Sequence, residues 1–190
     1  MRRSLLLCTM AIGLCACSNS PTSLATENKN PFTASRYGDE LADTLANLFI
    51  SKDAVVEQPG MKDIIQKKID EAKTIADDAR QEQQKGMMGS FIGIKEDVQG
   101  YGLLLEKTLY FSSDFQTQPG INLHVYLTNA IDPRDTAFPD KTALDLGVIQ
   151  SVYGAQQYKL PANSKPETYR TIVLWDTVLK RPYSFVQLTK

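Results

Sequence analysis

Cysteine is nearly absent from this sequence and occurs only near one end. The chain has 190 residues and three cysteines, Cys8, Cys15 and Cys17, so residues 18–190 contain none. That long segment cannot form a disulfide, supply a thiolate to a metal ion or use a cysteine nucleophile. A Cys-x-x-Cys-His motif is missing as well, which excludes covalently attached haem of the c type.

Histidine is equally scarce, because His124 is the only one in the chain. Any serine triad would have to use His124 as its base. The sequence also lacks the Gly-x-Ser-x-Gly motif that places a nucleophilic serine on a sharp turn. We therefore predict no catalytic residues and no enzyme activity.

A long hydrophobic run is missing too, although the first residues are apolar. Arg2 and Arg3 precede the apolar segment 5–14, which is too short to span a bilayer as a permanent helix. A basic start followed by a short apolar stretch is typical of a secretory signal peptide. We predict that residues 1–16 form such a signal.

The predicted signal ends in Leu14-Cys15-Ala16-Cys17, which resembles the lipobox of bacterial lipoproteins. This resemblance implies cleavage before Cys17 and attachment of lipid chains such as palmitate to Cys17. A lipid-anchored protein of the cell envelope is the predicted localisation. Ser18 favours the outer membrane, facing the periplasm, if the cell has two membranes. The alternative is an ordinary secreted protein that is cleaved nearby.

The net charge gives no sign of a nucleic-acid partner. The chain has 21 Lys and Arg against 22 Asp and Glu, and loss of Arg2 and Arg3 with the signal would leave 19 against 22. Binding to nucleic acid needs a basic face. The predicted partners are instead the membrane, through the lipid anchor, and an unidentified small ligand or envelope protein.

The next segments differ in their hydrophobic patterns. Residues 17–36 are rich in Ser, Thr, Asn and Pro, which predicts a disordered tether. Residues 37–85 show helical periodicity, and the second half has a narrow stripe at Ile65, Ile69, Ala72, Ala76 and Ala79. A helical hairpin that packs on itself or on the rest of the chain explains this stripe. A self-associating coiled-coil stalk is the alternative.

From Gly86 the hydrophobic period changes from about 3.6 to 2. Short segments with this period are separated by turn residues and have no helical pattern between them, which is typical of an antiparallel β-sandwich. The predicted strands are 87–94, 98–106, 108–112, 122–128, 144–150, 156–160, 169–176 and 183–188. The fold prediction is therefore a mainly β chain: a β-sandwich domain at 86–190 preceded by an α-helical hairpin or stalk.

The β region resembles the DM-thirteen domain family, which is associated with the DOMON superfamily. The matching residues include Gly89, Phe91, Gly100-Tyr-Gly102, Thr108-Leu-Tyr-Phe111, Phe115, Pro119–Leu127, Leu146-Gly147, Gly154, Gln157–Pro161 and Tyr169–Trp175. The resemblance implies a β-sandwich with a role in electron transfer. That role centres on a cysteine after the strand-ending tryptophan, and here this position holds Asp176. The acidic residue that the family often has after Pro-Gly is Asn122 here.

Four residues are the candidate functional positions: His124, Tyr126, Trp175 and Asp176. His124 and Tyr126 alternate on one face of a predicted strand, and Trp175 and Asp176 end another. Asp176 is either a buried acid with a raised pKa or a structural acceptor for backbone or Arg170, Lys180 and Arg181 donors. The aromatic residues either fill the core or line a ligand pocket.

No cofactor is predicted, and two alternatives remain. His124 could be an axial haem ligand together with Met87 or Met88, since imidazole and thioether both serve in that role. The loop 129–145 contains four aspartates whose oxygens suit calcium, Asp132, Asp135, Asp140 and Asp145. Two functions therefore stay open: a non-catalytic ligand- or protein-binding module and a redox or electron-transfer accessory protein.

Overall fold

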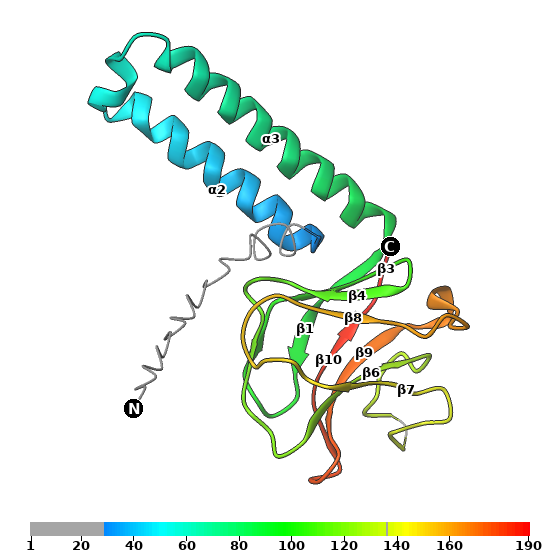
Figure 1. Cartoon of the computed structure of the whole chain (residues 1–190). Coiled ribbons are helices and arrows are strands. Elements are labelled where there is room, and N and C mark those ends of the chain that lie inside the picture. The colour runs from blue at the N-terminus through cyan, green and yellow to red at the C-terminus, as the bar shows by residue number, and fades with distance from the viewer. Residues whose placement is uncertain (1–28, 136) are drawn as a thin grey trace, which may run out of the picture.

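The computed structural model describes residues 29–135 and 137–190. The predicted signal peptide, the predicted lipid site at Cys17 and residues 17–28 of the predicted tether lie outside the described residues. Within the described ranges, two long helices precede a domain made of strands (Figure 1). No helix in those ranges is long and apolar enough to cross a membrane.

The first of these helices begins earlier than predicted. Helix α2 spans Pro31–Ile50, so residues 31–36 are helical and do not belong to a tether. The Asn30 side chain accepts a hydrogen bond from the Phe32 N–H at 3.0 Å, and Pro31 is already held at a helical φ. This cap, within a segment of polar composition, fixes where the helix starts.

Helices α2 and α3 form a tight antiparallel hairpin. A 3-10 helix, Ala54–Glu57, and Gly60 in the left-handed conformation lead the chain into α3, Met61–Lys85. The helices approach so closely that a Cβ atom at Gly38 would lie 2.5 Å from the Ala72 carbonyl oxygen. The predicted stripe of α3 is buried in this interface: Ile65, Ile69, Ala72, Ala76 and Ala79. The stripe therefore packs against its own chain, as in the hairpin prediction.

The remaining residues form an antiparallel β domain. Its strands are β1 Met87–Gly93, β2 Val98–Gln99, β3 Tyr101–Leu105, β4 Thr108–Phe111, β5 Gln116–Thr117, β6 Leu123–Thr128, β7 Leu144–Val148, β8 Gln156–Lys159, β9 Thr171–Asp176 and β10 Arg181–Gln187. Eight of them form one sheet in the order β7-β6-β9-β10-β1-β3-β4-β8, and β2 pairs with β5. The prediction of a mainly β, antiparallel fold is confirmed.

Strand β1 connects the two layers of the fold. Its residues 87–90 pair with β3, whereas its residues 91–93 pair with β10. The two halves of the sheet enclose a common hydrophobic core. Their far edges also meet, because the Gln150 side chain after β7 donates to the Gln157 carbonyl of β8 at 2.7 Å. The predicted sandwich is thus a single sheet that is folded over on itself and is close to a barrel.

One predicted strand is divided into two. The segment 98–106 forms β2 and β3, which are separated at Gly100 with a φ of +100°. A Cβ atom at Gly100 would lie 2.7 Å from the Phe115 Cα. The backbone therefore turns at the one residue type that tolerates both this φ and this close approach.

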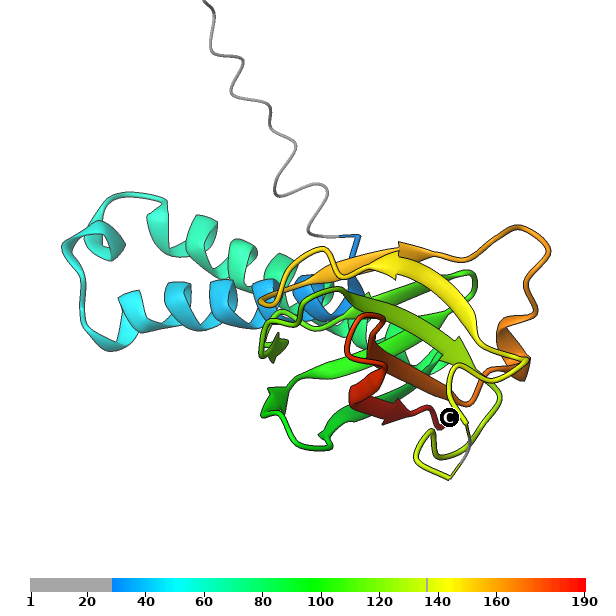
Figure 2. The same cartoon turned by 90° about the horizontal axis from the view of Figure 1, so that it is seen from below.

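The hairpin contacts the β domain at its base and extends away from it (Figure 2). The Asn30 side-chain amide donates to the Phe111 carbonyl at 2.8 Å, and the Arg36 guanidinium donates to the Ser113 hydroxyl at 3.2 Å. The buried apolar clusters of the two parts share no residue in the described chain. Each part therefore has a core of its own.

We expect a fragment that begins at Gly86 to fold without the helices. Its core is built from strands alone, and the loss of the Asn30 hydrogen bond costs only about 1 kcal/mol. The far-ultraviolet circular dichroism spectrum should be of the β type, and thermal unfolding should be cooperative. A fragment without a cooperative transition would mean that the hairpin completes the β core.

Candidate functional site

The predicted site residues lie on both faces of the paired strands β6 and β9. In this pair His124 is opposite Trp175, and Leu123 is opposite Asp176. Because side chains alternate along a strand, His124, Tyr126 and Trp175 share the outer face, whereas Asp176 faces the core. The structure therefore brings three of the four residues together and places Asp176 behind them.

The outer face of β6, β9 and β10 carries a second apolar cluster, made of Tyr126, Val173, Trp175 and Phe185. The loop that connects β6 to β7 packs against it. Phe138 of this loop lies 5.5 Å from the Tyr126 ring and 5.1 Å from the Trp175 ring, measured between ring centroids. Sequence reasoning missed Phe138, although a single aromatic residue in an aspartate-rich loop was a usable signal.

An open pocket lies beside these rings. Its volume is ≈ 350 Å³, which is near the lower limit for small-molecule sites. Aromatic side chains form most of its wall, and one lysine lies at its rim. The lining residues are Tyr126, Phe138, Pro139, Trp175, Thr177 and Lys180.

A hydrogen-bond network around His124 borders the pocket. The Asp145 carboxylate lies 2.9 Å from His124 Nδ1, and the Asn122 side-chain amide lies 3.2 Å from Nε2. This arrangement indicates the tautomer in which Nδ1–H donates to Asp145 and Nε2 accepts from Asn122. Both ring nitrogens are therefore engaged, and the histidine is positioned rather than free.

Asp145 is hydrogen-bonded to Tyr126, and the pKa values of both side chains are shifted. Burial raises the pKa of Tyr126 to about 12, together with the hydrogen bond from its hydroxyl to Asp145. For Asp145 itself, burial raises the pKa, but hydrogen bonds from the Gly147 N–H, His124 and Tyr126 outweigh this effect, so the pKa is lowered. Tyr126 is thus a neutral phenol and Asp145 an anion at neutral pH.

Asp176 is fully buried at the end of β9. One carboxylate oxygen accepts from the N–H groups of Ile121 and Asn122, at 2.7 and 3.3 Å. The other accepts from those of Val178 and Leu179, both at 2.9 Å. These backbone groups, rather than the Arg170, Lys180 or Arg181 side chains, are its hydrogen-bond partners among the described residues.

The pKa of Asp176 is lowered by these contacts. Burial alone would raise the pKa, but the four backbone N–H donors outweigh it. The ionised carboxylate thus fixes the chain before β6 to the turn between β9 and β10. This turn supplies Thr177 and Lys180 to the pocket, so Asp176 is a positioning residue.

Neither cofactor alternative fits the geometry. β1, which carries Met87 and Met88, is separated from β6 by β10 and β9, and both ring nitrogens of His124 are engaged. The residues do not fit a haem held by His124 and methionine. In the aspartate-rich loop, Asp132 binds Arg134, and Asp140 accepts from Thr128 and Thr142. The described residues contain no cluster of three or more His, Cys, Asp or Glu suited to a metal ion.

Comparison with known proteins supports one relationship. A family model described as "Electron transfer DM13" matches residues 90–188, which extends from β1 to the residue after β10. No curated protein and no solved structure matches the chain. The match includes the pocket and Asp176, and the helical hairpin lies outside it.

Proposed function

This chain belongs to the DM13 electron-transfer family, and from that premise we propose that it acts by binding. Its β domain is a non-catalytic module that holds a small ligand in the pocket between Tyr126, Phe138 and Trp175. The cysteine that the family resemblance implies is replaced by Asp176, whose carboxylate cannot cycle between thiol and disulfide. The redox role thus loses its thiol, whereas the β fold is kept.

The pocket itself is the observation that supports this proposal. Its aromatic walls offer flat apolar surface to a ligand, and Thr177 and Lys180 add polar groups at the rim. Asp176 holds the turn that carries those polar groups. The site is thereby formed before a ligand arrives, which reduces the entropy lost on binding.

We expect Phe138→Ala to weaken ligand binding about tenfold, because it removes one aromatic wall. Trp175 is the only tryptophan, so its fluorescence reports binding directly. Two nitroaromatic quenchers, 4-nitrobenzoate and 4-nitrobenzamide, are suitable probes. Tyr153→Ala is the control, since Tyr153 is 61% exposed and is not part of the pocket lining. If neither probe quenches wild-type Trp175 in a saturable way, the proposal is wrong.

A second candidate function is electron transfer, which the family match favours. The rings of His124, Tyr126, Phe138 and Trp175 form a continuous series with neighbouring centroids 6.2, 5.5 and 5.1 Å apart. A redox partner, or a haem held by residues other than His124 and methionine, would then be needed. The absorption spectrum of protein purified from its native envelope distinguishes the two functions, since a Soret band supports the second.

We also propose that the protein is anchored in the cell envelope by lipid on Cys17. The support is the segment 14–17 behind a basic and apolar leader. We expect Cys17→Ser to move the protein from the membrane fraction to the soluble fraction, because the lipid chains supply the membrane affinity. Cell fractionation followed by immunoblotting measures this. Full retention of the variant in the membrane would exclude the lipid anchor.

A further inference from the structure

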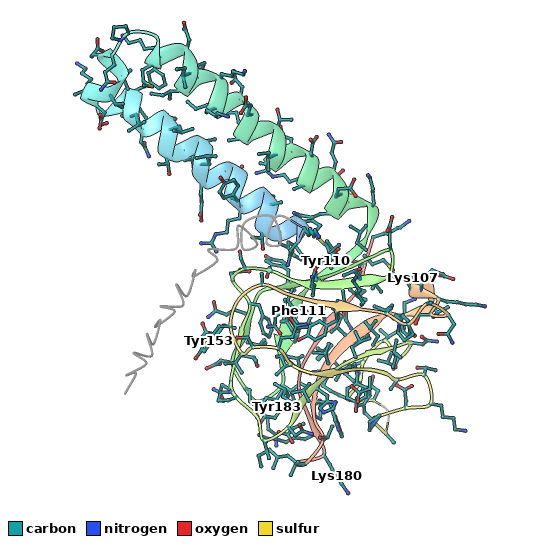
Figure 3. All side chains as sticks on the ribbon, in the orientation of Figure 1. Lys107, Tyr110, Phe111, Tyr153, Lys180 and Tyr183 are labelled. Carbon is teal, nitrogen blue, oxygen red and sulfur yellow. The ribbon has the colours of Figure 1, made fainter. Side chains whose placement is uncertain are left out.

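The charge at the pocket indicates which ligands it accepts, provided that the pocket is the binding site proposed above. Lys180 is the only charged residue among the lining residues. It lies in the turn between β9 and β10, at the end of the β domain opposite the helices (Figure 3). It takes part in no ion pair with the residues that the structure describes. Its ammonium group is therefore available to a ligand.

The carboxylates near the pocket are held by hydrogen bonds and are not among its lining residues. Asp140 accepts hydrogen bonds from the Thr128 hydroxyl at 2.5 Å and the Thr142 N–H at 2.6 Å. Asp145 accepts from His124 and from the Gly147 N–H at 2.8 Å. Lys180 is therefore the one charged side chain that lines the pocket among the described residues, and the two nearby carboxylates are directed toward their own hydrogen-bond donors instead.

The remaining walls favour a flat and mostly apolar ligand. Phe138 is tilted by 55° to the Trp175 ring and by 85° to the Tyr126 ring, so the walls present both ring faces and ring edges. A volume of ≈ 350 Å³ suits one or two fused rings rather than an extended molecule. Aromatic rings pack favourably in such offset and edge-to-face arrangements.

We infer that the pocket binds a small planar ring with one anionic substituent, namely an aromatic acid. The ring packs between Tyr126, Phe138 and Trp175, and the anionic group lies beside Lys180. The aromatic walls supply most of the affinity. Lys180 supplies the preference for an acid over a neutral molecule of the same shape, because its side chain is solvated and an exposed ion pair contributes little.

The test compares 4-nitrobenzoate with 4-nitrobenzamide, which differ chiefly in charge. Titration against the fluorescence of Trp175 gives a dissociation constant for each probe in the full chain. We expect the acid to bind about three- to fivefold more tightly than the amide, and the preference to fall as salt is added. Lys180→Met should remove the preference, whereas Lys180→Arg, which keeps the charge, should retain it.

Lys159→Met provides the matched control, because Lys159 is an exposed residue of β8 outside the pocket lining. It should keep the wild-type preference. Equal binding of both probes to the wild type, or a preference that survives Lys180→Met, overturns the inference but leaves a binding pocket. Absence of saturable binding for both probes overturns the proposed function itself.

Discussion

We expect Asp176→Asn to lower the free energy of unfolding by about 3 kcal/mol. The carboxylate is fully buried and accepts four backbone N–H groups. An amide has one acceptor oxygen, and its NH₂ group would face two of those donors. Hydrogen bonds to a charged acceptor are stronger than neutral ones, and a buried donor without a partner is costly.

Urea denaturation at neutral pH, followed by circular dichroism, measures this loss. Asp78→Asn is the matched control, because Asp78 is exposed on α3 and should change stability by less than about 0.5 kcal/mol. Asp176→Cys, which introduces the residue expected from the family resemblance, should also be destabilised. Wild-type stability of Asp176→Asn would show that the four hydrogen bonds contribute nothing net.

The same residue predicts a dependence on pH. The folded-state pKa of Asp176 is lowered relative to its ordinary value, which is about 3.9 in an unfolded chain. Its contribution is therefore complete above about pH 5 and is lost as the pH falls through the folded-state pKa. The stability difference between wild type and Asp176→Asn should shrink in that acidic range and stay constant from there to neutral pH.

We expect Phe111→Ala to lower the free energy of unfolding by about 4 kcal/mol, because it leaves a cavity in the middle of the aromatic core. Phe111 is fully buried, and its ring centroid lies 4.9 Å from Phe91, 4.8 Å from Phe115 and 5.5 Å from Tyr158. Figure 3 places it inside the β domain. Urea denaturation is again the measurement.

Two further variants make this result specific. Phe111→Leu should lose less stability, since it keeps part of the buried volume. Tyr153→Ala should lose little, because Tyr153 is largely exposed. A loss for Phe111→Ala no larger than for Tyr153→Ala would mean that the aromatic cluster is not the centre of the core.

Elements whose sequence pattern involves only neighbouring residues were mostly predicted at the correct positions. Helix α3 and the change to strands at Gly86 follow from hydrophobic periods, which involve residues a few positions apart. The beginning of α2 at Pro31 was missed, although Asn30-Pro31 is itself a local start signal. The division of segment 98–106 at Gly100 depends instead on the close approach of Phe115, a distant residue.

The candidate site likewise combines features that follow from the local sequence with features that depend on distant residues. Alternation along β6 places His124 and Tyr126 on one face, so their proximity could be predicted. The packing of Phe138 against Tyr126 and Trp175 depends on how the β6–β7 loop folds back. The partners of Asp176 are backbone N–H groups, which every residue except proline carries. No residue pattern could therefore distinguish them from the arginine and lysine side chains considered earlier.

The sequence by itself determined the fold class, the family resemblance and the absence of a thiol after residue 17, because these depend on residue identity and local period. The tertiary structure alone decided that β1 links two layers, that Phe138 completes a pocket and that Asp176 fixes the turn bearing Lys180. Strand pairing and loop packing join residues far apart in the chain. Their free energies depend on burial and geometry that exist only after folding.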